Sequence, residues 1–275
     1  MAAAPASPEA LAILEFYRDA GVTTAEADTP GGLWGWDEAA AKTLRPPPRP
    51  DTPKPKVKPT GVSAGLEEAL AQAEQLAASC TTLEDLTEAI REFTGCPLHE
   101  SARGAVVHDG VLGADILVMG EAPGREEDRQ GKPFVGRSGQ LLDRMLAAIG
   151  VSRVPEGDQQ AACITNAVYW RPPGNRNPTT SEVAVCLPFA KRFIALSKPK
   201  LVFLAGIVPT KALFPDAPKI TRARGVWREI ELEGLAPIPA LPIFHPAFLL
   251  RQPAQKRWAW QDLLKAQAKL NETRS

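Results

Sequence analysis

Residues 115–120 read Asp115-Ile-Leu-Val-Met-Gly120, a short apolar run that ends in glycine. A run of this length and composition is typical of a strand that is buried on both faces of a parallel sheet. Three similar runs follow along the chain: Cys163-Ile-Thr-Asn-Ala-Val168, Leu201-Val-Phe-Leu-Ala205 and Leu241-Pro-Ile-Phe-His245. The four runs together predict the strands of one sheet.

Helical segments precede and separate these strands. The apolar periodicity predicts helices over residues 62–79, 82–93, 138–149, 180–196, 208–214 and 254–270. Thr82 and Ser138 stand where N-caps are expected. Because strands alternate with helices, the sequence predicts an α/β fold, a three-layer α/β/α sandwich around a central, mainly parallel four-stranded sheet.

The main domain is predicted to follow a proline-rich segment. Seven prolines fall within residues 46–59, with lysines between them, which predicts an extended linker over residues 46–61. The linker separates a small N-terminal helical element, residues 1–45, from the main domain, residues 62–275. The N-terminal element is too short to form a hydrophobic core of its own.

The charge is balanced over the whole chain but not along it. The 275 residues include 32 basic and 32 acidic side chains. Residues 1–160 carry 15 basic and 25 acidic side chains, whereas residues 161–275 carry 17 basic and 7 acidic ones. Such asymmetry between two halves of a chain favours a nucleic-acid partner.

The sequence also predicts where the protein works. No apolar run approaches the ~18 residues that span a bilayer, so we expect no membrane association. The start, Met1-Ala-Ala-Ala-Pro-Ala-Ser-Pro, lacks the basic region of a secretory signal. The four cysteines are few and scattered, which is typical of a reducing compartment. We therefore expect an intracellular, cytoplasmic protein.

Four kinds of side chain follow the predicted strands. Glu121, Phe134, Asn166 and His245 supply a carboxylate, an aromatic ring, an amide and an imidazole. Ligands of such sheets bind at the carboxyl ends of the strands. This set, among glycines and arginines, suits a flat hydrogen-bonding heterocycle beside a phosphate chain. The first loop lacks the Lys-Ser/Thr of a nucleotide P-loop and the Gly-x-Gly-x-x-Gly of a dinucleotide site.

Each of these residues also has a purely structural interpretation. Asn166 could satisfy loop backbone groups, His245 could be a packed core residue, and Phe134 could belong to the core. Glu121 could cap the helix that follows it. The functional interpretation depends on their occurring together, in order, at the strand ends.

Several motifs in this order resemble the uracil-DNA glycosylase superfamily, and within it the family 4 type. The motifs are Gly120-Glu-Ala-Pro-Gly124, Glu127-Asp128, Gly131-x-Pro-Phe-Val-Gly136-x-x-Gly139-x-Leu-Leu142, Thr165-Asn166, Arg171-Pro-Pro-Gly-Asn-Arg176 and His245-Pro-Ala-x-Leu-Leu-Arg251. The resemblance covers roughly residues 93–265 and leaves out residues 1–60.

The resemblance implies that uracil is flipped out of DNA into a pocket. Phe134 would stack on the base, and Asn166 would bond its pairing edge. His245 would face the charge that develops on a uracil oxygen. Glu121 would orient the attacking water or stabilise the oxocarbenium-like sugar. Classical relatives carry an Asp directly after this position, where this chain has Ala122.

The implied residues form three groups. The catalytic residues are Glu121, Asn166 and His245. The substrate-binding residues are Gly120, Ala122, Pro123, Gly124, Phe134, Asn166 and His245. The DNA-binding residues are Arg171, Asn175, Arg176, Arg222, Arg224, Leu250 and Arg251, of which the Arg251 segment would enter the duplex.

The cysteines depart from the family pattern. Family 4 enzymes usually hold a four-iron four-sulfur cluster through four cysteine thiolates. The pattern begins with Cys-x-x-Cys, whereas this chain reads Cys96-Pro-Leu-His99, and Trp170 stands at the third position. Cys96 and Cys186 match the pattern as remnants of it. We therefore expect neither a metal site nor a cofactor.

The predicted function is that of a monomeric uracil-DNA glycosylase. It would hydrolyse the N-glycosidic bond of uracil in DNA and leave an abasic site for base-excision repair. One alternative is a protein that binds or cross-links uracil-DNA with little turnover. A relative of that kind uses a His nucleophile after the second strand, where Pro172–Pro178 of this chain has no His. A further possibility is docking through the proline-rich linker.

Overall fold

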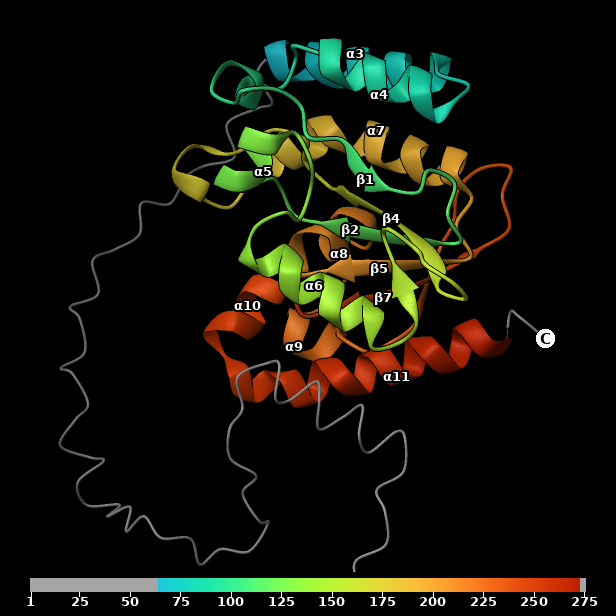
Figure 1. Ribbon diagram of the computed structural model, residues 1–275. Helices are drawn as coiled ribbons and strands as arrows, with labels where there is room; N and C mark the ends of the chain where they lie inside the picture. Colours follow the sequence, from blue (N-terminus) through green and yellow to red (C-terminus); the bar gives the residue numbers. More distant parts are fainter. Residues whose placement is uncertain (1–63, 273–275) are drawn as a thin grey trace, which may run out of the picture.

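The computed structural model of the protein describes residues 64–272 (Figure 1). The predicted N-terminal element, residues 1–45, and the predicted linker, residues 46–61, lie outside the described residues. The described part begins two residues after the predicted start of the main domain.

The first apolar run forms β2 (Ile116–Gly120), and all five of its residues are buried. It pairs in parallel with β4 (Gln160–Asn166) on one side and with β5 (Leu201–Ala205) on the other. Beyond β5 lies β7 (Ile238–Ile243), which is also parallel. The four predicted strands therefore form the parallel centre of the sheet, in the order β4-β2-β5-β7.

The predicted total of four strands was wrong, because residues 64–272 form a sheet of seven. The additional strands are β1 (His108–Gly110), β3 (Val151–Ser152) and β6 (Arg228–Ile230). β1 is antiparallel to β4 and β6 is antiparallel to β7, so these two strands form the edges, while β3 pairs with β4. Each is two or three residues long and none is fully buried, which is too short and too mixed to show a strand periodicity.

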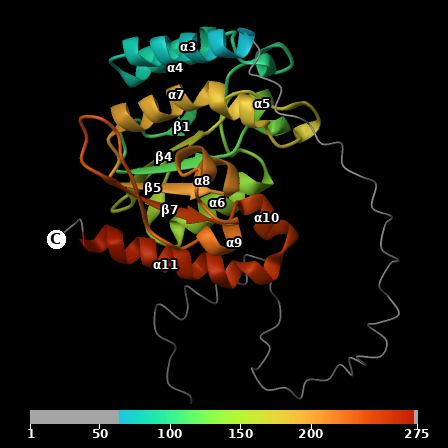
Figure 2. The same cartoon turned by 180° about the vertical axis from the view of Figure 1, so that it is seen from behind.

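Helices cover both faces of the sheet (Figures 1 and 2), which confirms the three-layer α/β/α prediction. α7 (Thr180–Ser197) covers one face, and α3 (Ala64–Ser79) and α4 (Leu83–Glu92) pack against it. α8 (Ile207–Leu213) lies with this group. The opposite face is covered by α6 (Arg137–Ala147), α10 (Pro246–Arg251) and α11 (Lys256–Glu272). Each layer of helices encloses one buried apolar cluster against the sheet.

Short helices fill the connections between these elements. Two are α5 (Arg125–Gln130) and α9 (Ile220–Ala223), and three are 3₁₀ helices at Pro97–Glu100, Pro173–Asn175 and Pro253–Gln255. They are shorter than the window in which helical periodicity can be recognised. Among residues 64–272, no helix is both long and apolar enough to cross a membrane.

Of the two predicted N-caps, Thr82 is confirmed and Ser138 is wrong. Thr82 caps α4 and forms a capping box with Asp85. Ser138 is not a cap, because α6 begins one residue earlier, after Gly136. The Glu127 carboxylate instead accepts hydrogen bonds from the N–H groups of Val135 and Gly136, just before this helix. The glutamate of α5 therefore binds the backbone N–H groups before α6, where a side chain of α6 itself was expected to act as the cap.

Candidate active site

The carboxyl ends of the central strands open onto a cavity of about 510 Å³. Its walls are formed by Glu121, Ala122, Pro123, Gly124, Glu127, Phe134, Ser138, Asn166, Pro172, Asn175, Arg176, Asn177, Gly206, Ile207, Ile220, Phe244, His245, Ala247, Phe248 and Arg251. The four side chains that the sequence singled out, Glu121, Phe134, Asn166 and His245, all line this one cavity. Its position at the strand ends is that expected for the fold.

Two neighbouring strand ends bring Gly120 and Asn166 together. These residues are the last of β2 and β4 and stand in register with each other. The backbone of the next residue, Ala167, donates to the Gly120 carbonyl at 2.9 Å. A Cβ at position 120 would overlap both the Asn166 Oδ1 atom and the Phe134 ring. Glycine is therefore the residue that lets the amide and the ring approach this strand end.

Phe134 reaches the cavity from a loop rather than from a strand. The residue is buried and has a φ of 53°, a left-handed conformation that bulky side chains rarely adopt. Its ring stacks against that of His245, with the centroids 5.4 Å apart and the planes 29° from parallel. The ring therefore forms one flat wall of the cavity, next to the Asn166 amide.

His245 follows β7 and begins α10, where its imidazole serves as the N-cap. The Nδ1 atom accepts a hydrogen bond from the Ala247 N–H at 3.1 Å. Burial, together with the positive charge of Arg251, lowers the pKa of His245 to about 4. A neutral imidazole whose Nδ1 accepts must carry its proton on Nε2. His245 is therefore held as a neutral Nε2–H donor.

Glu121 is the first residue after β2 and supplies the carboxylate of the cavity. Burial raises the pKa of Glu121 above the ordinary range of a glutamate. A carboxylate with a raised pKa is a stronger base and a more strongly interacting anion in a low-dielectric site. The cavity therefore combines a neutral hydrogen-bond donor with a carboxyl group whose basicity is raised by burial.

Some of the predicted DNA-binding residues line the cavity and others do not. Asn175, Arg176 and Arg251 line the cavity, and Arg222 is exposed on α9, whose first residue also lines it. Arg171 donates to Asn175 at 2.7 Å, and Arg176 forms a two-pronged pair with Glu182 at 2.9 and 2.6 Å. These pairs hold the loop between β4 and α7 in place.

Arg224 and Leu250 lie away from the cavity walls. Arg224 binds Asp262 through Nε at 2.7 Å and through Nη2, and it also donates to the Trp258 carbonyl at 2.7 Å. Its side chain is 14% exposed and that of Asp262 is fully buried. Leu250 is half-buried on α10. The guanidinium of Arg224 is thus engaged within the fold, whereas Arg222 and Arg251 remain exposed to solvent.

The cysteines that match the family pattern lie in the interior on the α7 side of the sheet. Cys96 and Cys186 share a hydrogen bond between their side chains, and both are fully buried. Trp170 is also fully buried, and its ring lies 6.3 Å from that of Phe93. Among residues 64–272, no group of three or more His, Cys, Asp and Glu side chains comes together as metal ligands.

Several cavity residues were not singled out from the sequence. Ser138 was interpreted as a helix cap, and Glu127 appeared in a motif without a role. Gly206 has a φ of 106° directly after β5, and a Cβ there would lie 3.3 Å from that of His245. Gly206 directly follows the third predicted strand, which is where ligand-binding residues are expected. Phe248 and Ile207 carry no such signal, because apolar side chains fit a core equally well.

Comparison with known proteins agrees with the family resemblance seen in the motifs. Residues 107–265 match the model of the Uracil DNA glycosylase superfamily. The chain is 37% identical over 185 residues to the Type-4 uracil-DNA glycosylase of Pyrobaculum aerophilum, covering 66% of this chain and 91% of the relative. It is 35% identical over 190 residues to that of Thermotoga maritima, covering 68% and 93%. It is 36% identical over 192 residues to that of Sulfurisphaera tokodaii, covering 67% and 83%.

Proposed function

Because the chain belongs to the uracil-DNA glycosylase superfamily, we propose that it is a uracil-DNA glycosylase. It is a hydrolase of N-glycosyl bonds that excises uracil from DNA and leaves an abasic site for base-excision repair. The observation that carries this proposal is the convergence of Glu121, Phe134, Asn166 and His245 on one cavity at the strand ends. The identities of 33% and more to Type-4 uracil-DNA glycosylases support it.

Phe134 and Asn166 select the base in this proposal. The uracil is flipped out of the DNA because its glycosidic bond is not accessible within the duplex. Phe134 stacks on the ring of the base, and the amide of Asn166 hydrogen-bonds to its pairing edge. An oriented amide distinguishes uracil from cytosine, since the two bases carry opposite donors and acceptors at that edge. Ala122, Pro123 and Gly124 form the backbone wall beside it, and Gly120 lies next to the Phe134 ring and the Asn166 amide.

His245 stabilises the leaving base. When the bond between the base and the sugar breaks, its electron pair remains on the uracil and negative charge develops on a carbonyl oxygen of the base. The Nε2–H of neutral His245 donates to this oxygen, in a buried site where such a bond is worth more than in water. The low pKa of His245 means that the donor stays neutral at physiological pH.

Glu121 acts on the other half of the substrate. Its carboxylate stabilises the positive charge of the oxocarbenium-like sugar, or orients the water that supplies a hydroxyl to the sugar carbon. Ala122 has no carboxylate, so we assign the acidic role in this loop to Glu121. Electrostatic stabilisation of both departing halves is therefore the main contribution to the rate.

Residues at the rim hold the DNA. We assign phosphate contacts to Arg222 and Arg251, with Asn175, Arg176 and Arg171 along the loop after β4. The charge of Arg224 is offset by Asp262, so its part is to anchor the end of α9, which carries Arg222, to α11. Leu250 precedes Arg251 in the segment that enters the duplex. The basic C-terminal half of the chain supports this placement, and binding should weaken with salt.

The residues present do not fit an iron–sulfur cluster of the kind found in family 4. Such a cluster needs four thiolates, whereas two cysteines match the pattern. Cys96 and Cys186 are free thiols that share a hydrogen bond, and the bulky Trp170 stands at a third ligand position. We therefore propose that the enzyme works without this cluster. Iron in stoichiometric amount after anaerobic purification would contradict the proposal.

We further propose a cytoplasmic enzyme that acts as a monomer on uracil-containing DNA. Glu121, Phe134, Asn166 and His245 already meet in one cavity of the single chain, which supports a site that needs no second copy. Sedimentation with and without an oligonucleotide tests the monomer, and fractionation of cells tests the location.

One assay tests the activity. The protein is incubated with a labelled oligonucleotide that contains a single uracil, and abasic sites are then cleaved with alkali. Strand cleavage is expected, whereas a denaturant-resistant band shift would indicate cross-linking instead. Asn166→Ala and His245→Ala are expected to lower the rate by about a hundredfold or more. If both variants retain full activity, the assignment of the site is wrong.

A further inference from the structure

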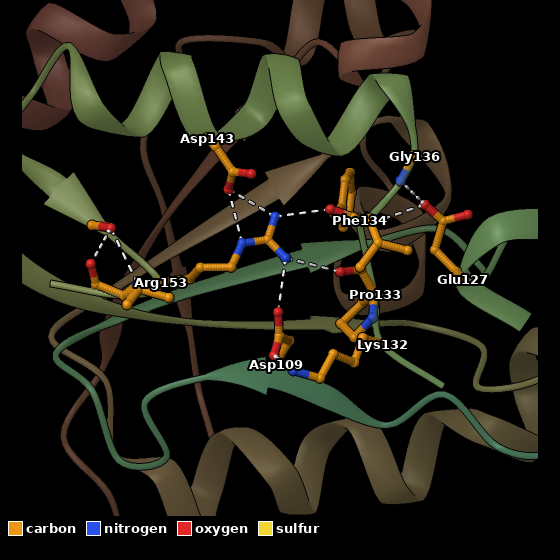
Figure 3. A network of polar contacts seen from close by, with 11 residues as sticks. Asp109, Glu127, Lys132, Pro133, Phe134, Gly136, Asp143 and Arg153 are labelled. Carbon is orange, nitrogen blue, oxygen red and sulfur yellow. Dashed lines mark hydrogen bonds and ion pairs between the residues drawn. The ribbon is translucent and has the colours of Figure 1, made fainter. Parts of the chain in front are cut away.

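Phe134 depends on a side chain from a distant part of the sequence. Arg153 follows β3 and lies beside the loop that carries Phe134 (Figure 3). We infer that it is a positioning residue that holds Phe134 against the base. This inference rests on the proposed function, because Phe134 has its role only if a base enters the cavity.

The guanidinium of Arg153 engages the loop through two backbone carbonyls. Nη1 donates to the Pro133 carbonyl at 3.0 Å, and Nη2 donates to the Phe134 carbonyl at 2.9 Å. The side chain of Arg153 is 10% exposed, so these bonds are largely protected from solvent. The planar guanidinium presents its donors as a fork, which a lysine ammonium cannot reproduce.

Two carboxylates hold the guanidinium itself in place. Nη1 binds Asp109 of β1 at 3.0 Å, and Nε binds Asp143 of α6 at 2.8 Å. Figure 3 shows Arg153 between these two acids, with its fork directed at the loop. All three nitrogens are thus engaged, and the position of the guanidinium is fixed by a strand and a helix of the main fold.

The loop is held from the other side by Glu127. Its Oε1 atom accepts from the N–H groups of Val135 and Gly136 at 3.0 and 2.9 Å. Four successive backbone polar groups, at residues 133–136, are therefore bound by two largely buried side chains of opposite charge. This arrangement determines the backbone on both sides of Phe134, whose left-handed φ of 53° is not one that the residue would adopt by itself.

The backbone position of Phe134 decides where its ring lies. The ring is within contact of Gly120 and stacks on His245, so its space in the cavity is narrow. Without the fork, we expect the loop to populate conformations in which the ring no longer covers the base. A displacement of about 1 Å in a positioning group can lower a rate about a hundredfold.

A double-mutant cycle distinguishes this role from a general loss of stability. Single-turnover excision is measured for the wild type, Arg153→Met, Phe134→Ala and the double variant. We expect Arg153→Met to lower the rate by about tenfold to a hundredfold. If Arg153 acts through the ring, adding this change to Phe134→Ala costs about twofold at most. The inference would be overturned if the double variant showed the product of the two single losses in rate. An Arg153→Met variant as fast as the wild type would overturn it too.

Arg192 offers a matched control. Its Nε and Nη2 also donate to a backbone carbonyl, that of Cys80, at 3.0 and 2.5 Å, on the far side of the sheet. Arg192→Met should lower the melting temperature but leave the excision rate unchanged at temperatures where the protein is folded. Arg153→Lys keeps the charge without the fork and should give an intermediate rate. It takes the place of Arg153→Met in the cycle if that variant does not fold.

The outcomes distinguish a failure of the proposed function from a failure of the inference. If the wild type leaves uracil in place, the proposed function fails. If the wild type excises uracil but Phe134→Ala or Arg153→Met does so at the same rate, the proposed function stands and the inference fails.

Discussion

Gly120→Ala tests how closely the walls of the cavity approach each other. A Cβ at this position would lie 2.7 Å from Phe134 Cζ, and closer still to Phe134 Cε2 and Asn166 Oδ1. Ordinary contact needs at least about 3.4 Å, so the nearer ring atom, Cε2, must retreat by about 1 Å. The backbone of Gly120 resists displacement, because Gly120 pairs with Asn166 and the preceding Met119 is paired on both sides. We expect excision to slow by about tenfold to a hundredfold and stability to fall by about 1–3 kcal/mol.

The assay is single-turnover excision on an oligonucleotide with one uracil, beside a urea unfolding curve. Gly104→Ala is the matched control, because a Cβ there meets nothing within 4 Å and its φ is ordinary. This control should match the wild type in both measurements. A Gly120→Ala variant with the wild-type rate would refute the argument that the glycine sets the separation of ring and amide. A loss of stability with an unchanged rate would refute it equally.

Three further predictions follow from charges. Because burial raises the pKa of Glu121, the carboxylate is lost as pH falls through a value above the ordinary glutamate range, whereas His245, with a pKa of about 4, stays neutral. The acid limb of the pH–rate profile should therefore disappear in Glu121→Gln, with a rate lower by about a hundredfold to a thousandfold. Asp262→Ala leaves Arg224 without its buried partner and should cost about 3–5 kcal/mol in urea unfolding. Arg222→Ala should reduce the slope of log affinity against log salt by about 1, measured by fluorescence anisotropy on DNA.

The centre of the sheet was predictable from the sequence, and its edges were not. The runs that became β2 and β5 are continuous and apolar because both of their faces are covered by helices. β1 and β6 pair on one side each and have residues that are partly exposed, so their sequences carry no continuous apolar signal. Their pairing is fixed by the strands beside them, β4 and β7, and therefore depends on contacts that are distant in sequence.

Part of the candidate site was likewise predictable from the sequence and part was not. Glu121, Asn166 and His245 follow or end strands, so the rule that ligands bind at strand ends was enough to group them from the sequence. Phe134 was grouped with them because its loop comes after the first predicted strand, although the residue itself ends no strand. Arg153 carried no signal, because it lies 19 positions from Phe134 and 44 from Asp109 and belongs to no recognised motif. A contact that depends on the register of β3 with β4 cannot be inferred from local pattern.

Placing the aromatic wall on a loop has a physical consequence for how the site is stabilised. The strand-end residues receive their positions from the hydrogen bonds of the sheet, which hold Gly120 and Asn166 in register. The loop with Phe134 has no ladder of this kind, so its backbone groups need partners from side chains. Arg153 and Glu127 supply them, and both are themselves largely buried. The catalytic groups and the aromatic wall thus depend on different interactions, and loss of the Arg153 fork should displace the ring while leaving Asn166 and His245 in place.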